Sequence, residues 1–309
     1  MIEQVLKSKF LGALTGTGVG DALGAPFEGR RKVNLEEIEE VAETRKVLTY
    51  TDDTHMMLGV AESLIQIRGF DGKHMAQTFM RNYEAKLWRG YGPGPPKVFR
   101  MIRAGEPWDK VASKLYKGGS LGNGSAMRVA PIGLLYSTNL AKLREIAYKS
   151  SIITHSHELG KEGAALQAYA VALAVNAQPN REVDQEAFIV KLYNFAQHPL
   201  YRQKIAGIKD LLGELDRAKV ISALGNGVEA LRSVPTAIYS FLKHPKSYTD
   251  PVLYAISLGG DTDTIAGMAG AISGAYLGVE AIPDRWKGKL ENRPYIETLA
   301  EKLWQLAVS

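Results

Sequence analysis

Apolar residues recur along most of this chain at intervals of three or four positions, which places them on one face of a helix. Met56, Val60, Leu64 and Ile67 show this spacing. Alternation of apolar and polar residues is almost absent, and the one stretch that fits, 47–50, is too short to found a sheet. The pattern therefore predicts an all-α protein. We expect helices at about 5–23, 35–43, 51–67, 72–87, 97–104, 107–116, 125–136, 140–153, 158–176, 184–196, 202–217, 226–243, 250–257, 263–278 and 294–307.

The predicted helices follow one another without a linker. The chain has 309 residues, enough to bury a sizeable core, and shows no repeat of 20–50 residues. We therefore expect one compact domain over residues 1–309. The segment 180–220 is more polar than its neighbours, so we expect an insertion or a mobile flap there, one that helps to select the substrate.

Composition excludes several classes of chemistry. The chain has no cysteine, which excludes disulfides, thiol catalysis and cysteine-ligated zinc. Its net charge of +5 suits an anionic ligand, but no run of Lys and Arg exceeds three residues, so we expect no direct nucleic-acid recognition. The N-terminus does not resemble a signal peptide, and no apolar run approaches the roughly 20 residues that span a bilayer. We expect a cytoplasmic monomer that does not bind membranes.

Two acidic clusters stand at the starts of predicted helices. Thr51–Thr54 contains two adjacent aspartates, and Asp261 lies two residues before Asp263. Carboxylates this close repel one another unless a cation compensates them, and no Lys or Arg lies within six residues of Asp261. Their oxygen ligands suit Mg²⁺, Mn²⁺ or Ca²⁺. Each cluster alone is also explained as a helix N-cap, but the pair is typical of a two-metal site.

Small residues dominate the helices at 5–23 and 263–278. A glycine inside a helix costs about 1 kcal/mol relative to alanine, so several glycines on one helix indicate close contact with another backbone. If these two helices pack against each other, Asp21 and Glu28 come near the acidic clusters.

Two glycine-rich loops offer free backbone N–H groups. Residues 118–126 precede a predicted apolar helix, which is an arrangement that binds phosphate, although the Lys of a Walker A loop is missing. Gly90–Gly94 is the second loop, and its Tyr91 could stack on a base or a ribose. Ordinary turns are the alternative interpretation of each loop.

Two other motifs have weaker support. His155 and His157 are separated by one residue, but no third ligand lies nearby, so a hydrogen bond to a ligand or a satisfied polar histidine is favoured over zinc. Asp261–Ile265 half fits the motif of haloacid-dehalogenase-type phosphatases. That motif opens an α/β domain, whereas only about 45 residues without strands follow here.

Taken together, these motifs resemble the ADP-ribosylglycohydrolase family, which includes dinitrogenase reductase-activating glycohydrolase. The branch that acts on serine-linked ADP-ribose, poly(ADP-ribose) and O-acetyl-ADP-ribose is the most similar, on the residues 224–227 and 233–239. That branch has an aromatic residue where this chain has Leu121, which puts adenine stacking in question. The resemblance runs almost from end to end and is carried by 16–24, 27–28, 50–54, 89–92, 122–131, 154–155 and 259–264.

The resemblance implies an orthogonally packed helical domain with two Mg²⁺ or Mn²⁺ ions in a cleft. It implies cleavage of the C1″ bond of ADP-ribose attached to a protein or a small molecule. By matching motifs, the implied metal ligands are Thr51, Asp52, Asp53, Asp261, Asp263 and Thr264. The implied substrate contacts are Glu28, Tyr91, Gly92, Gly122, Asn123, Gly124, Ser125 and His155.

The catalytic group and the substrate stay open on the sequence alone. Glu28 is our first candidate for proton transfer and Asp261 the second. One alternative function is hydrolysis of ADP-ribosylarginine. Another is a non-catalytic ADP-ribose-binding protein, such as the crystallins of this family, but such a protein would be expected to have lost metal ligands, and all six are present here.

Overall fold

The computed structural model describes residues 2–178 and 182–309, and over these residues the chain is all-α, as the hydrophobic periodicity predicts. The described residues contain no β-strand, only two isolated bridges, of which one joins Leu48 to Leu290. The elements are α1 Ile2–Gly24, η1 Ala25–Phe27, α2 Leu35–Thr44, α3 Asp52–Ile67, α4 Gly72–Ala85, α5 Gly94–Arg103, α6 Val111–Leu115, α7 Ala130–Leu135, α8 Leu140–Ser151, α9 Glu158–Asn176, α10 Gln185–Phe195, α11 Pro199–Leu211, α12 Arg217–Leu224, α13 Ala230–Lys243, α14 Thr249–Ser257, α15 Thr262–Leu277, η2 Val279–Ala281, α16 Asp284–Lys287 and α17 Arg293–Val308.

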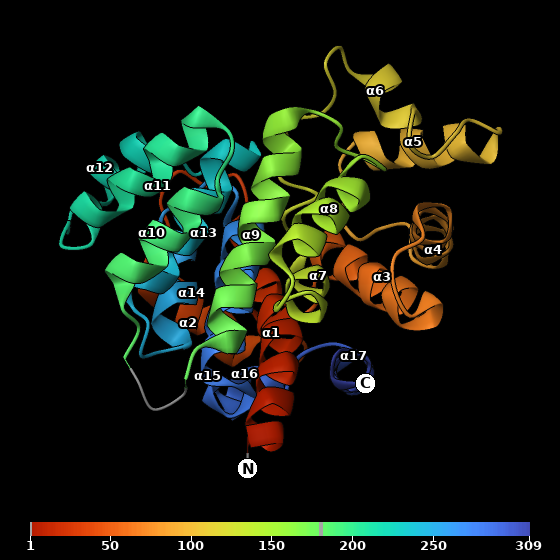
Figure 1. Cartoon of the computed structure of the whole chain (residues 1–309). Helices are drawn as coiled ribbons and strands as arrows, with labels where there is room; N and C mark the ends of the chain where they lie inside the picture. The colour runs from red at the N-terminus through yellow and green to blue at the C-terminus, as the bar shows by residue number, and fades with distance from the viewer. Residues whose placement is uncertain (1, 179–181) are drawn as a thin grey trace.

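Helices α1 and α15 lie side by side and form the centre of the molecule (Figure 1). Their backbones touch. A Cβ added to Gly274 would lie 2.0 Å from the carbonyl oxygen of Gly12, and one added to Gly16 would lie 2.5 Å from that of Gly270. The expectation that the two small-residue helices pack together is therefore confirmed, and the close approach explains why glycine is used despite its low helix propensity.

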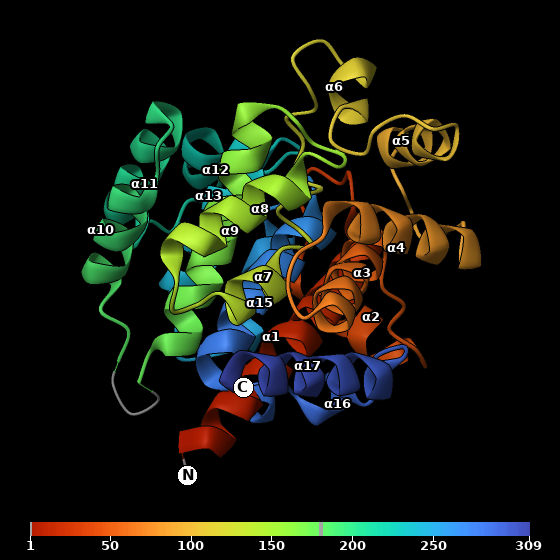
Figure 2. The same ribbon diagram turned by 45° about the vertical axis from the view of Figure 1, so that its right-hand side comes forward.

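The remaining helices surround this pair. Helices α9, α13 and α14 pack against α15, and α17 and α3 pack on the side of α1. Helix α9 is buried along most of its length, as its alanine content predicts. Figures 1 and 2 place α10 and α11 on one side of the molecule and α4, α5 and α6 on the opposite side. One acidic cluster lies at the start of α3 and the other at the start of α15. Because α15 belongs to the central pair and α3 packs against α1, both clusters lie next to this pair.

Several predicted helix boundaries were wrong, each for a local reason. The helix expected at 125–136 begins only at Ala130, where Pro131 occupies the first turn. The helix expected at 107–116 is reduced to five residues, Val111–Leu115. Helix α12 was missed altogether; Asp216 caps it by accepting a hydrogen bond from the backbone N–H of Ala218 at 2.9 Å.

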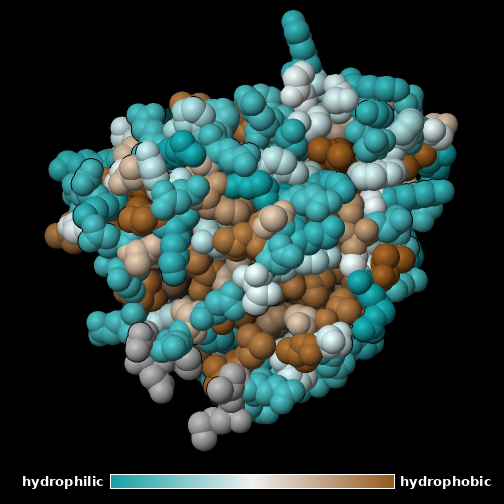
Figure 3. All heavy atoms as spheres, viewed as in Figure 1, coloured by the Kyte–Doolittle hydropathy of each residue, from teal (hydrophilic) through white to brown (hydrophobic). Residues whose placement is uncertain are grey.

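The surface seen in Figure 3 is mostly hydrophilic, with apolar side chains reaching it between the polar ones. Within the described residues, none of the helices combines the length and the apolar character that crossing a membrane requires.

The contact between α1 and α15 can be tested with Gly274→Ala. The new methyl group has no room, so the helices must separate, and we expect a loss of about 1–3 kcal/mol in the free energy of unfolding despite the gain in helix propensity. Gly207→Ala on α11 is the matched control, because nothing lies within 4 Å of its added Cβ. Urea denaturation should show opposite signs for the two variants; equal stability of Gly274→Ala and the unchanged protein would contradict the packing argument.

Candidate metal centre and active site

The N-termini of α3 and α15 meet at the centre of the protein and bring both acidic clusters together. Thr51 is the N-cap of α3, and its Oγ1 accepts a hydrogen bond from the backbone N–H of Asp53 at 3.3 Å. Asp261 is the N-cap of α15, but its side chain makes no capping hydrogen bond. Capping therefore accounts for Thr51 and leaves most of the carboxylates unexplained, although both helix dipoles favour negative charge here.

A cavity of about 300 Å³ opens over these helix ends. It is lined by twelve of the residues predicted for the site and, among its lining residues, by no lysine or arginine. Tyr91 and Ser125 are the two predicted residues that do not line it. The predicted residues that line it are Glu28, Thr51, Asp52, Asp53, Gly92, Gly122, Asn123, Gly124, His155, Asp261, Asp263 and Thr264.

Glu28 is held against the second acidic cluster. One carboxylate oxygen from each of Glu28, Asp261 and Asp263 lies within 4.8 Å of the others. The segment after Glu28 is fixed by two backbone hydrogen bonds, from Gly29 N–H to Gly260 O (2.8 Å) and from Gly260 N–H to Arg30 O (2.7 Å). Consecutive positive φ angles at residues 259–260, +69° and +76°, form the turn that allows this approach, and only glycine adopts them without strain.

Burial and mutual repulsion shift the acids of the cavity toward their protonated forms. Burial, followed by the charge of Asp261, raises the pKa of Asp263 to about 9. Burial, followed by the charge of Asp21, raises the pKa of Asp52 to about 7. The pKa of Glu28 is also raised, chiefly by burial and then by Asp261. Such a set of acids is stable in its charged form only when cations bind to it.

The donor set fits divalent cations. The Oδ1 atom of Asp53 is buried and has no hydrogen-bond partner, and burial together with the charge of Asp263 raises the pKa of Asp53 well above its usual value. His155 supplies no positive charge in compensation, because burial lowers its pKa to about 3. Unpartnered carboxylate oxygens in an all-oxygen site are the ligands of a hard cation.

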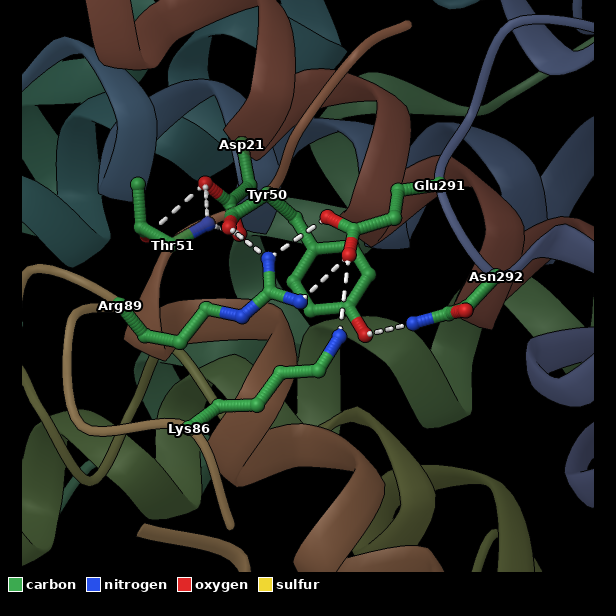
Figure 4. A network of polar contacts seen from close by, with 7 residues as sticks. All are labelled: Asp21, Tyr50, Thr51, Lys86, Arg89, Glu291 and Asn292. Atoms are coloured by element: carbon green, nitrogen blue, oxygen red, sulfur yellow. Dashed lines mark hydrogen bonds and ion pairs between the residues drawn. The ribbon is translucent and has the colours of Figure 1, made fainter.

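Asp21 holds the acidic cluster Thr51–Thr54 in place through hydrogen bonds. It is fully buried on α1 and accepts hydrogen bonds from the backbone N–H groups of Thr51 (3.0 Å) and Thr54 (3.0 Å), and from both threonine hydroxyl groups. Figure 4 shows its contact with Thr51. The sequence placed Asp21 near the cluster but gave it no role, because nothing local indicated which groups its carboxylate would bind.

The glycine loop before α7 is anchored by Asn123. Its backbone N–H donates to Val228 O at 2.9 Å, and its amide donates to Ser233 Oγ at 3.1 Å and to Asp261. The prediction that this loop leads directly into a helix N-terminus was wrong, since turns separate it from Ala130. Backbone groups of the loop, without a helix dipole, face the cavity.

Three predicted contacts take a different form from the one expected. The hydroxyl of Ser125 is buried and donates to Gly160 O at 3.2 Å. The ring of Tyr91 packs against Tyr83 and Phe99, and its hydroxyl lies 3.0 Å from His55 Nδ1; a stacking role for this ring stays a prediction. His157 caps α9 through Nδ1, 3.1 Å from the backbone N–H of Leu159, while His155 alone lines the cavity.

The described part of the polar segment, residues 182–220, does not line this cavity. Residues 180–181 lie outside the described residues, and none of 182–220 lines the cavity. The helices of this segment pack beside α9 and α13 on the flank of the molecule. The expectation of an insertion or a mobile flap at 180–220 stays a prediction, and its described part does not line the cavity.

Comparison with known proteins agrees with the sequence motifs. A model of the family ADP-ribosylglycohydrolase matches residues 3–309. ADP-ribosylhydrolase ARH3 of Gallus gallus is 36% identical over 97% of this chain and 93% of its own length. The human ARH3 is 34% identical over 96% of this chain and 93% of its length.

A more distant relative and a solved structure extend the same result. An uncharacterized protein of Archaeoglobus fulgidus is 32% identical over 97% of both chains. A solved "ADP-ribosylglycohydrolase-related protein complex" superposes with a TM-score of 0.77 at 28% identity, covering 98% of this chain and 99% of the other. The fold, the acidic cavity and these matches agree: this chain belongs to the ADP-ribosylglycohydrolase family of hydrolases.

Proposed function

We propose that this chain is a divalent-metal-dependent hydrolase that removes ADP-ribose from serine-linked protein sites, from poly(ADP-ribose) or from O-acetyl-ADP-ribose. One observation carries the proposal: carboxylates from two helix ends share one cavity with the exposed Glu28, and no lysine or arginine lines it. The family match over residues 3–309 supports one catalytic domain for the whole chain, 1–309. The motifs at 224–227 and 233–239, which resemble those of the serine-linked branch, favour that branch over arginine-linked substrates.

The proposed cofactor is a pair of Mg²⁺ or Mn²⁺ ions. The residues that would hold them are two threonine hydroxyl groups and four aspartates: Thr51, Asp52, Asp53, Asp261, Asp263 and Thr264. When bound, such ions polarise ribose hydroxyl groups and increase the acidity of water.

Asp21 orients the hydroxyl group of Thr51 for this role. A hydroxyl that binds a cation must present a lone pair, so its proton has to point elsewhere. The nearer acceptor for that proton is Asp21 Oδ1, at 2.9 Å, compared with 3.3 Å for Asp53 Oδ2. The four hydrogen bonds that Asp21 accepts from Thr51 and Thr54 thus set the direction of the first turn of α3.

The walls of the cavity suit ADP-ribose. Backbone groups of Gly92, Gly122 and Gly124 would contact the diphosphate, and Tyr91, Asn123 and Ser125 hold those loops in place. A Cβ on Gly124 would lie 2.6 Å from the ring of His155, which therefore lies directly beneath the loop as a neutral hydrogen-bonding group.

We assign proton transfer to Glu28 and keep Asp261 as the second candidate. Cleavage of the C1″ bond builds positive charge on the ribose. The departing oxygen takes a proton from the acid, and the water that adds to C1″ returns a proton to the resulting carboxylate. A carboxyl group whose pKa burial and the charge of Asp261 raise keeps its proton at a higher pH and can donate it. Glu28 also precedes the backbone turn that fixes its position.

Two alternatives remain. An ADP-ribosylarginine hydrolase would use the same buried half of the site, and the acceptor side would differ. A non-catalytic ADP-ribose-binding protein would bind without turnover, and the complete set of carboxylates argues against it. Monomeric state and the absence of nucleic-acid binding stay predictions from the sequence.

Two substitutions should separate metal binding from proton transfer. Asp53→Asn should abolish release of ADP-ribose and remove the rise in melting temperature that Mg²⁺ causes. Glu28→Gln should lower kcat by about 10²–10⁴-fold and keep that rise, because it removes the proton donor alone. Glu39→Gln, which changes an exposed glutamate of α2, is the control. Full activity in excess chelator would contradict the proposed function.

The stability of the metal-free protein should depend on pH. The folded-state pKa values of Asp52 and Asp263 are raised to about 7 and about 9, above the value of about 3.9 in unfolded chains. The stability that their protonation gives to the metal-free protein is lost as the pH rises through those values. In chelator, the melting temperature should fall from about pH 6 to about pH 9, and the stabilisation by Mg²⁺ should grow over the same range. Scanning calorimetry tests this, and Asp263→Asn should show a smaller slope; a flat profile would contradict it.

The role of Asp21 in orienting Thr51 can be tested with Asp21→Asn. The amide keeps the shape of the side chain but places a donor where two hydroxyl and two N–H donors converge, so one of the threonine hydroxyl groups must turn. We expect Mn²⁺ affinity to fall about 10- to 100-fold, which titration calorimetry measures. Asp71→Asn, at the exposed cap of α4, is the matched control. Unchanged Mn²⁺ affinity in Asp21→Asn would show that its role is structural only.

A further inference from the structure

A second cavity adjoins the acidic one and has no role in the function proposed so far. It measures about 700 Å³, within the range of small-molecule sites, and shares Thr51 and Gly90 with the acidic cavity. The residues that line it are Ala25, Pro26, Arg45, Thr49, Tyr50, Thr51, Ala85, Lys86, Trp88, Arg89, Gly90 and Glu291. Ala25 and Pro26 belong to the short helix that ends one residue before Glu28.

The charge of this second cavity is opposite to that of the first. Its lining contains Arg45, Lys86 and Arg89 against the single carboxylate of Glu291. Arg89 donates to both oxygens of Glu291 at 2.7 Å, and Lys86 lies 3.2 Å from the same group (Figure 4). Arg45 is exposed and forms no ion pair with any residue that the structure describes. The excess of positive charge suits an anion.

The two buried residues of the network form a rigid wall. The guanidinium of Arg89 lies 4.1 Å from the centre of the Tyr50 ring and donates to Tyr50 O at 2.8 Å. Its side chain is only 6% exposed, so Arg89 fixes the wall, whereas Lys86, with 49% of its side chain exposed, can reach a ligand.

An aromatic ring stands free at the mouth of this cavity. Trp88 is 86% exposed, which is unusual for so large an apolar side chain. An exposed indole beside lysine and arginine is the combination that stacks a nucleobase while the cations bind its phosphates. A peptide would need free hydrogen-bonding groups instead, and here the hydroxyl of Thr51 is bound to Asp21 and the carbonyl of Tyr50 to Arg89.

We propose that this cavity is a second nucleotide subsite, which binds a phosphorylated nucleoside carried by the leaving group, with the base on Trp88 and the phosphate between Arg45 and Lys86. Its position on the leaving-group side rests on the proposed function, because Glu28 would donate its proton there. A chain of ADP-ribose units has this leaving group, since the unit that follows the cleaved C1″ bond is an adenine nucleotide.

Binding tests the subsite without any turnover. The metal cavity is filled with saturating ADP-ribose and Mg²⁺, and AMP is then titrated by calorimetry. We expect one further AMP site, weakened at least about fivefold in Trp88→Ala and in Arg45→Ala. Lys73→Ala, an exposed lysine of α4, should bind AMP as the unchanged protein does. No AMP binding, or equal binding in all variants, would overturn the proposal, as would Arg45-dependent binding of an acidic peptide in place of AMP.

A kinetic comparison places the subsite relative to the reaction. Trp88→Ala should raise KM at least about fivefold for a dimer of ADP-ribose and leave kcat and the hydrolysis of O-acetyl-ADP-ribose unchanged, because the acetyl leaving group does not reach the indole. An equal rise of KM on both substrates would overturn the leaving-group assignment. Absence of turnover on every substrate would instead contradict the proposed function, and the AMP titration would still decide whether the subsite exists.

Discussion

The close approach of α1 and α15 is the contact on which the rest of the site depends. Glycine carbonyl groups of one helix occupy the space that side chains of the other would need, as at Gly12 and Gly274. This contact places Asp21, on α1, beneath Thr51 and beside the start of α15. If larger residues separated the helices, the acidic groups would move apart, and the cavity between them would no longer concentrate charge.

Concentrating buried carboxylates costs free energy, and the fold compensates that cost in parts. The two helix N-termini favour negative charge, and the hydrogen bonds that Asp21 accepts offset part of the cost of its burial. Asp261 receives a hydrogen bond from Asn123. One oxygen of Asp53 has no hydrogen-bond partner. The raised pKa of Asp53 shows that the free-energy cost of burying its charge is not fully compensated. Bound cations would remove it, so stability and function are linked at one place.

Thr51 and Gly90 line both of two adjoining cavities of opposite charge. One cavity is lined by carboxylates, and in the other the Arg89–Glu291 pair holds Tyr50 beside an exposed indole. The short helix η1 borders the second cavity and leads directly to Glu28 in the first. In the proposed reaction, a group that leaves past Glu28 would meet this positively charged surface.

The sequence by itself determined the helical class, the placement of the acidic clusters at helix starts and the pairing of the two glycine-rich helices, because periodicity, capping and glycine content are local properties. It also predicted twelve of the residues that line the acidic cavity. Only the tertiary structure decided that the Tyr91 ring turns toward His55, that the glycine loop ends in turns before Ala130, and that the second cavity forms. The physical reason is that periodicity tells which face of a helix is buried but not what it is buried against, and residues as distant in sequence as Arg45, Trp88 and Glu291 meet only through packing.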